Sequence, residues 1–254
     1  MKKYELTSET KVIDGVEVHR IKALNSFGNI KKGELGGWIE SEKNLSQSGD
    51  AWVGDNAMVY DNAMVYDNAM VCGNATVGRN ATVGGNARVV ENATVYGNAM
   101  VCGNATVREN ATVGGHARVV ENATISENAT ISGNATVCGD AMVAGNATLG
   151  WDAMVAGNAT VSGYATVCGN ATVSESADYI VFKNWWSSGR HFTWTRSNNK
   201  WKVGCFYGSG EELIAKAYKD SEKSGREYER VVKYVESILK EEYNDNGNRN
   251  KCED

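Results

Sequence analysis

The stretch VCGNATVRENATVGGHARVVENATISENATISGNATVCGD, from Val101 to Asp140, repeats a motif of six residues. From Ala51 to Ala177 alanine occupies every sixth position, 22 times without interruption. Val, Ile or Leu follows two places after alanine 21 times, from Val53 to Val173. This alternation predicts a short strand with alanine and the aliphatic residue facing inward. A motif of six residues buries a core only when copies stack. The sequence therefore predicts a mainly β protein built on a parallel β-helix.

The other positions of the hexapeptide predict how the chain turns between strands. Gly, Asp or Glu and then, in most repeats, Asn precede the alanine. We expect Asn to take a left-handed backbone conformation at each corner, because it tolerates positive φ better than most other residues. Asn side chains stacked along each corner can also form amide ladders. Residues 49–178 then make a parallel solenoid with sides of six residues.

The motifs V-Y-G-N-A-T and V-C-G-N-A-T resemble the hexapeptide repeat of the trimeric LpxA-like superfamily, over residues 49–177. This resemblance implies a left-handed helix of about seven triangular turns, each with three sides of six residues, so that residues 18 apart stack. It also implies a homotrimer packed along one face, with a monomer as the alternative. The stretch IKALNSFGNIKKGELGGWIESEKNLSQSGDAWV is similar to a group of bacterial and prophage hexapeptide-repeat proteins. That similarity implies a phage-encoded counter-defence factor acting in the host cytoplasm.

The repeat separates four segments of the chain. We expect an N-terminal hairpin and capping coil over residues 1–48, the β-helix over 49–178, a C-terminal α+β domain over 179–243, and a flexible tail over 244–254. The hairpin turns at Asp14-Gly15, a strong two-residue turn signal. In the capping coil we expect Leu45 to stand in the alanine row.

The C-terminal segment alternates strand and helix signals. Strands are predicted over 179–186, 190–196 and 200–207. Capping boxes at Ser209-Gly-Glu-Glu212 and Ser224-Gly-Arg-Glu227 predict the starts of two helices. The second helix has an apolar stripe, made of Tyr228, Val231, Val232, Val235, Ile238 and Leu239.

Charge is distributed unevenly along the chain, whose formal net charge is −5. Residues 49–177 carry 4 basic and 11 acidic side chains, a balance that argues against binding of duplex DNA. The sequence contains no apolar run of membrane-spanning length and opens without a secretory leader, so a cytoplasmic location is expected. Six cysteines in such a chain are expected to remain reduced, and no metal or cofactor is expected.

Catalytic chemistry has one candidate base in the repeats, His116. Hexapeptide-repeat acyltransferases use a histidine base, and an enzyme of this kind is the alternative function. His116 stands in the Asn position of its repeat, however, where a corner role is the simpler interpretation. Glu91, Glu109 and Glu127 stack at intervals of 18 and predict a solvated acidic edge. We therefore assign no catalytic residue and expect a non-catalytic protein.

A basic, aromatic segment follows the repeats. Residues 179–208 hold four of the seven tryptophans, five Lys or Arg, and no Asp or Glu. Aromatic planes beside cations suit a flat, anionic, nucleotide-like ligand. The candidate ligand-binding residues are Trp185, Trp186, Arg190, His191, Trp194, Arg196, Lys200, Trp201 and Lys202. The alternatives are that these aromatic residues form the core of a small domain, or that the partner is a host protein.

Overall fold

The computed structural model describes residues 2–249, which form two compact units. The solenoid unit contains the chain up to residue 180 together with residues 195–198. The C-terminal unit contains residues 181–194 and the chain from residue 199 onward. Each unit is described by itself below.

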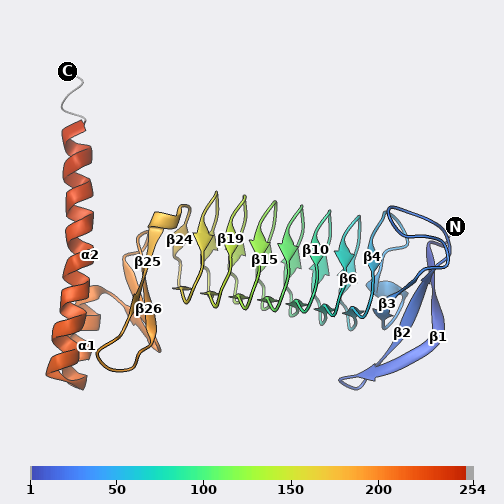
Figure 1. Cartoon of the computed structure of the whole chain (residues 1–254), viewed down its shortest axis with the longest axis horizontal. Helices are drawn as coiled ribbons and strands as arrows, with labels where there is room; N and C mark the ends of the chain where they lie inside the picture. The colour runs from blue at the N-terminus through green and yellow to red at the C-terminus, as the bar shows by residue number, and fades with distance from the viewer. Residues whose placement is uncertain (1, 250–254) are drawn as a thin grey trace. The chain divides into compact units, whose positions relative to one another are not determined.

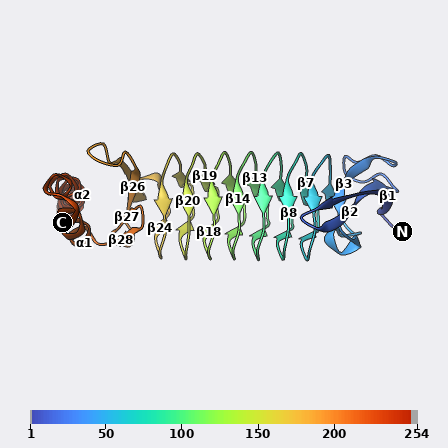
Figure 2. The same ribbon diagram turned by 90° about the horizontal axis from the view of Figure 1, so that it is seen from below.

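Three parallel sheets form the sides of the solenoid, and successive strands pass from one sheet to the next (Figures 1 and 2). The β4 face consists of β4 (Trp52–Val53), β7 (Met70–Val71), β10 (Arg88–Val89), β13 (Thr106–Val107), β16 (Thr124–Ile125), β19 (Met142–Val143) and β22 (Thr160–Val161). The β5 face contains β5 (Met58–Val59), β8 (Thr76–Val77), β11 (Thr94–Val95), β14 (Thr112–Val113), β17 (Thr130–Ile131), β20 (Thr148–Leu149) and β23 (Thr166–Val167). The β6 face consists of β6 (Met64–Val65), β9 (Thr82–Val83), β12 (Met100–Val101), β15 (Arg118–Val119), β18 (Thr136–Val137), β21 (Met154–Val155) and β24 (Thr172–Val173).

The interior of the solenoid is the stack of alanine and aliphatic rows that the repeat predicts. Ala93, Ala111 and Ala129 are fully buried, and so are Val95 and Val113 beside them. The strand residue between each alanine and its aliphatic partner faces outward. Strands in neighbouring turns pair in register at intervals of 18, as in Thr94 opposite Thr112. The predicted fold class is therefore confirmed. The capping turn adds one more parallel strand to the β5 face, which then has eight.

The corners differ from the prediction in one respect. Positive φ falls on the residue before Asn, for example at Glu109 (φ 61°) and Gly103 (φ 77°), and not on Asn itself. Asn is instead placed to bond along the stack, and Asn92 Nδ2 donates to Asn110 Oδ1 at 3.3 Å. Acidic corner residues stabilise the next turn in a similar way. The carboxylate of Asp67 accepts a hydrogen bond from the backbone N–H of Gly85 at 3.1 Å.

A cap of three strands begins the solenoid. β1 (Tyr4–Ile13) and β2 (Val16–Ala23) form an antiparallel hairpin, and β3 (Leu35–Ile39) joins it to the β5 face. Asp14 (φ 51°) and Gly15 (φ 84°) make the two-residue turn, which confirms the predicted hairpin.

The capping turn is two residues longer than a regular turn. Trp38 pairs with Met58, an offset of 20 where the repeat has 18. After the short helix η1 (Glu42–Asn44), Leu45 bridges to Val65 and is fully buried. Leu45 therefore occupies the aliphatic row, and its expected place in the alanine row is wrong. The reason is the insertion, which moves Leu45 along the strand by two residues and so keeps it facing inward.

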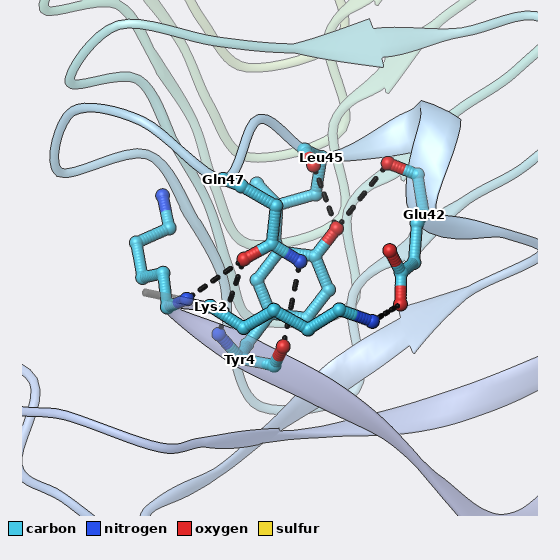
Figure 3. Close-up of polar contacts among 6 residues, drawn as sticks. Lys2, Tyr4, Glu42, Leu45 and Gln47 are labelled. Carbon is cyan, nitrogen blue, oxygen red and sulfur yellow. Dashed lines mark hydrogen bonds and ion pairs between the residues drawn. The ribbon is translucent and has the colours of Figure 1, made fainter.

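Polar contacts fasten the base of the hairpin to this capping turn (Figure 3). The Tyr4 hydroxyl donates to the Leu45 carbonyl at 2.6 Å, and burial, followed by the Glu42 charge, raises the pKa of Tyr4. The Gln47 side chain accepts from the backbone N–H of Lys3 at 2.8 Å. Lys2 Nζ lies 2.6 Å from Glu42 Oε1. These contacts fix where β1 starts.

Lys3 makes the cap sensitive to pH. Its side chain is buried, and Nζ donates to the carbonyl of Ala51 at 2.8 Å. Burial lowers the pKa of Lys3 to about 8, against an opposing effect of Asp50. Between pH 8 and the ordinary Lys pKa of 10.5 the unfolded chain binds more protons, so stability rises with pH in that window.

We therefore expect wild type to gain stability relative to Lys3→Met, by up to roughly 3 kcal/mol, as pH rises from about 8 to about 10.5. Urea unfolding of both proteins across this range measures the difference. Identical pH dependence of the two proteins would contradict the buried, ionisable environment assigned to Lys3.

The C-terminal segment forms a four-stranded sheet followed by two helices. After the short helix η2 (Ser176–Asp178), the sheet runs in the order β25 (Tyr179–Lys183), β26 (His191–Thr195), β27 (Lys200–Val203) and β28 (Phe206–Gly208). Three strands were expected here. The segment predicted over 200–207 contains two strands, because the chain turns at Gly204, which has φ 55°.

The helices are α1 (Gly210–Asp220) and α2 (Glu222–Arg249). The capping box of Ser209 and Glu212 is confirmed at the start of α1. The second helix starts earlier than predicted, because the Ser221 hydroxyl accepts from the Ser224 N–H at 3.1 Å and Ser224 lies inside the helix. Helix α2 also continues through residues 244–249, where we expected a tail, and residues 250–254 lie outside the described part. Neither described helix is long and apolar enough to cross a membrane.

Candidate ligand-binding cleft

A cleft of about 350 Å³ opens on the β5 face, beside the tip of the hairpin. This volume lies within the range of small-molecule sites, roughly 300–1,000 Å³. The hairpin contributes one wall and the first turns of the solenoid contribute the rest. The lining residues are Asp14, Val16, Tyr60, Asp61, Thr76, Gly78, Arg79, Thr94 and Tyr96.

Two tyrosines and a glycine stand in one row of the cleft. Tyr60, Gly78 and Tyr96 follow each other at intervals of 18, so the tyrosines are two turns apart, or roughly 9.6 Å. A Cβ atom at Gly78 would lie 3.2 Å from Cζ of Tyr60, so the Tyr60 ring leans over Gly78. The missing side chain at position 78 therefore leaves room for the tyrosine ring.

The same tyrosine-over-glycine packing occurs elsewhere on the solenoid. The Tyr96 ring leans over Gly114 in the next turn, and on the β6 face the Tyr66 ring leans over Gly84. The packing alone is thus a structural device. Tyr60 and Tyr96 differ from Tyr66 because charged side chains lie next to them in the cleft.

Charged and hydroxyl groups converge between the two tyrosines. Burial, then the charges of Asp14 and Asp61 beside the hydroxyl group, raise the pKa of Tyr60. The guanidinium carbon of Arg79 lies 5.7 Å from the centre of the Tyr96 ring, a cation–π arrangement. Asp61 Oδ2 accepts from the Arg79 backbone N–H at 3.2 Å. The cleft therefore presents both acceptors and donors next to aromatic surface.

A polar hollow of about 470 Å³ shares two residues with the cleft, Asp61 and Arg79. Its other lining residues are Glu40, Ser41, Lys43, Asn62 and Asn80. The backbone N–H of Asp61 donates to Glu40 Oε2 at 2.6 Å, which ties the capping turn to the corner below it. The cleft and the hollow therefore adjoin at these two residues.

The hairpin is held over the β5 face at both its base and its middle. Its base is fixed by the contacts of Tyr4 and Gln47 (Figure 3). Farther along, Lys11 Nζ lies 4.3 Å and Arg20 Cζ 5.4 Å from the centre of the Trp38 ring. Trp38 pairs with Met58, on the strand that leads to Tyr60. These contacts position Asp14 at the mouth of the cleft.

The tryptophans of the basic, aromatic segment have a different environment. Trp186, Trp194 and Trp201 are buried, with 8%, 1% and 2% of their surface exposed. Trp194 Nε1 donates to Asn199 Oδ1 at 2.8 Å, and Trp186 packs edge-on against Tyr228, with ring centres 4.9 Å apart. These rings are core, which favours the packing interpretation of the segment. Trp185 is the exception, and 71% of its surface is exposed.

The basic residues of that segment differ in exposure. Arg190 is exposed, whereas His191, Lys200 and Lys202 are half-buried. Arg196 is half-buried and belongs to the solenoid unit, where its backbone N–H donates to the Asp178 carbonyl at 2.8 Å.

His116 and the acidic edge have structural partners. A ring nitrogen of His116 lies 3.5 Å from the side-chain amide of Asn98, so His116 occupies a place in an Asn ladder. Arg108 Nη1 lies 2.9 Å from Glu109 Oε1 on the acidic edge. Among the described residues, no group of three or more His, Cys, Asp or Glu side chains is placed to hold a metal ion.

The sequence prediction missed the cleft, although two of its signals are visible. Tyrosine recurs after 36 residues with glycine midway, and Arg79 is the basic residue in a corner position that otherwise holds Gly, Asp, Glu or Trp151. The third component, Asp14, gave no such signal. Its place beside Tyr60 depends on how the hairpin folds back, which no local pattern specifies.

One family model, described as the YdcK beta solenoid repeat, matches residues 57–73. The matched residues cover β5 to β7 and include Tyr60 and Asp61 of the cleft. This similarity agrees with a repetitive β-solenoid and extends over a short part of it. No curated protein matches the chain.

Proposed function

We propose that this protein is a non-catalytic binding protein that holds a small polar ligand in the cleft between the hairpin tip and the β5 face. The observation that carries the proposal is the convergence of Asp14, Tyr60, Arg79 and Tyr96 around a ligand-sized space. Pockets that combine aromatic walls with a few converging polar groups are the usual form of a binding site. The site differs from the nucleotide site that the C-terminal tryptophans suggested.

Two contacts favour binding over acyl transfer. The Tyr60 hydroxyl lies beside the Asp14 carboxylate in the cleft, and its raised pKa keeps it protonated at neutral pH. His116, the candidate base of an acyltransferase, is engaged with Asn98 in the ladder. These groups are better suited to hold a structure or a ligand than to transfer protons.

A thermal-shift panel tests the proposal. Wild type and Tyr96→Ala are melted with neutral sugars, amines, nucleotides and acetyl-CoA, because a ligand that binds only the folded state raises the melting temperature. We expect at least one compound to stabilise wild type and not Tyr96→Ala. Turnover of acetyl-CoA, or a set of shifts that is unchanged by the substitution, would contradict a non-catalytic cleft.

The hexapeptide-repeat resemblance supports a further part of the proposal, assembly as a homotrimer through the β6 face. On this face Met64 and Met154 expose 48% and 41% of their surface, and Met100 lies half-buried between them. Apolar columns on a solenoid side favour association. The similarity to prophage proteins supports a phage-encoded counter-defence role in the host cytoplasm, in which the cleft sequesters a ligand or the trimer blocks a host protein.

Replacing Met100 and Met154 by glutamate is expected to dissociate the trimer, because it places six carboxylates at the contact of three chains. The matched control is Thr112→Glu with Thr148→Glu on the β5 face, which should leave assembly unchanged. Analytical ultracentrifugation measures both. A monomeric wild type, or equal dissociation by both pairs, would contradict assembly through the β6 face.

A further inference from the structure

The cleft differs from an anion site in its charge. Asp14 and Asp61 contribute two carboxylates and Arg79 one guanidinium, so its formal charge is −1. The adjoining hollow adds Glu40 and Lys43, which cancel. A phosphate or carboxylate in the cleft would meet two like charges, and a cation would meet Arg79. An uncharged ligand avoids both repulsions.

The polar groups also fit a particular kind of uncharged ligand. The carboxylates accept hydrogen bonds, the guanidinium donates up to five, and the hydroxyls of Thr76 and Thr94 do both. A ligand with several hydroxyl groups meets all of them, because each hydroxyl donates one hydrogen bond and accepts others. A ligand with only donors or only acceptors would leave part of this lining unsatisfied.

Aromatic rings line the cleft beside these polar groups. Tyr60 leans over Gly78, and Tyr96 carries the guanidinium of Arg79 near its face. The Tyr60 ring offers flat apolar surface to the C–H face of a saturated ring, whose edge hydroxyls then meet the polar groups. Tyr96 packs on Gly114 and contacts the Arg79 guanidinium, so its role is to hold that donor in the cleft. Polar edges and apolar faces in one small molecule are characteristic of pyranose sugars.

We propose that the cleft binds a neutral saccharide, with Tyr60 against a ring face, Asp14, Asp61 and Arg79 on its hydroxyl groups, and Tyr96 holding the Arg79 guanidinium in place. This inference rests on the proposed binding function and specifies its ligand. Both a free sugar and the end of a glycan chain present this chemistry. The hollow beside Arg79 has room for a second residue of a chain.

Calorimetry and saturation-transfer NMR test the ligand class. The probes are glucose, galactose, mannose and N-acetylglucosamine with their linear trisaccharides, beside glucose 6-phosphate and glucosamine as charged forms of one ring. We expect a neutral sugar to bind, with an affinity that changes little with salt. A trisaccharide that binds more tightly than its monomer identifies a glycan chain, and equal affinity identifies a free sugar.

Variants locate the binding. Arg79→Asn should weaken the best neutral probe by about tenfold or more, since asparagine tolerates the positive φ of 59° while the charged donor is lost. Tyr96→Ala should weaken it similarly. The matched control is Tyr66→Ala, which removes the same tyrosine-over-glycine packing outside the cleft and should leave affinity unchanged.

Tighter binding of glucose 6-phosphate or glucosamine than of every neutral sugar would overturn the saccharide class while leaving a ligand-binding cleft. Equal losses in Tyr66→Ala and Tyr96→Ala would overturn the location. Failure of every sugar to bind overturns the inference as well. The proposed binding function then stands only if the thermal-shift panel shows another ligand that depends on Tyr96.

Discussion

Trp194→Ala should destabilise the C-terminal unit by about 3–5 kcal/mol, the usual cost of removing a large aromatic side chain from a core. Trp194 is 1% exposed and its indole N–H donates to Asn199 at 2.8 Å, so the substitution loses both packing and a hydrogen bond. Unfolding followed by circular dichroism measures the effect. Helices α1 and α2 make its signal sensitive to this unit.

Trp185→Ala provides the control for that experiment, because it removes the same residue type from an exposed position nine residues earlier. We expect its stability to stay close to wild type. Equal losses in the two variants, or no loss in Trp194→Ala, would contradict the buried environment of Trp194. A nucleotide that binds wild type and not Trp185→Ala would support a ligand site in the C-terminal segment.

Ala111→Leu should destabilise the solenoid by at least about 1–3 kcal/mol through overpacking. Ala111 is fully buried, and Ala93 and Ala129 lie directly above and below it in the same row. Three added heavy atoms find no space there without separating turns that are held by backbone hydrogen bonds of 2.9 Å. The loss of stability therefore arises from several neighbouring turns rather than from one site.

The matched control is Thr112→Leu, the next residue on the same strand, whose side chain faces outward. It places the same leucine side chain on the outer surface of the same strand and should leave the melting temperature within a few degrees of wild type. Thermal melts of both proteins give the comparison. An unchanged midpoint for Ala111→Leu would mean that the alanine row does not face the interior.

The repeat made most of the solenoid predictable from sequence, because each hexapeptide specifies its own inward and outward residues. Predictions failed where one residue type serves two purposes. Asn suits both a left-handed corner and an amide ladder, and the structure uses it in the ladder while Gly, Asp or Glu takes positive φ. Leu45 was misplaced for a related reason, since its row depends on an insertion that has no marker in the sequence.

The C-terminal segment and the cleft show two further limits of sequence patterns. Tryptophans beside Lys and Arg fit a core and a ligand site equally well, and only burial separates the two interpretations. The cleft joins Asp14 to Tyr60 and Tyr96, residues far apart in the chain that meet because the hairpin folds over the β5 face. The basic corner residue Arg79 and the row of Tyr60, Gly78 and Tyr96 indicate a site only once the position of the hairpin over the β5 face is known.

Native mass spectrometry of the protein purified from its source most directly tests the central claim, that the cleft at Tyr60 and Tyr96 holds a ligand. For wild type we predict three copies of the 27.4 kDa chain that retain an uncharged small molecule. For Tyr96→Ala prepared in the same way we predict the same assembly without that molecule. Wild type that carries no ligand, or a ligand retained equally by Tyr96→Ala and wild type, would contradict the account.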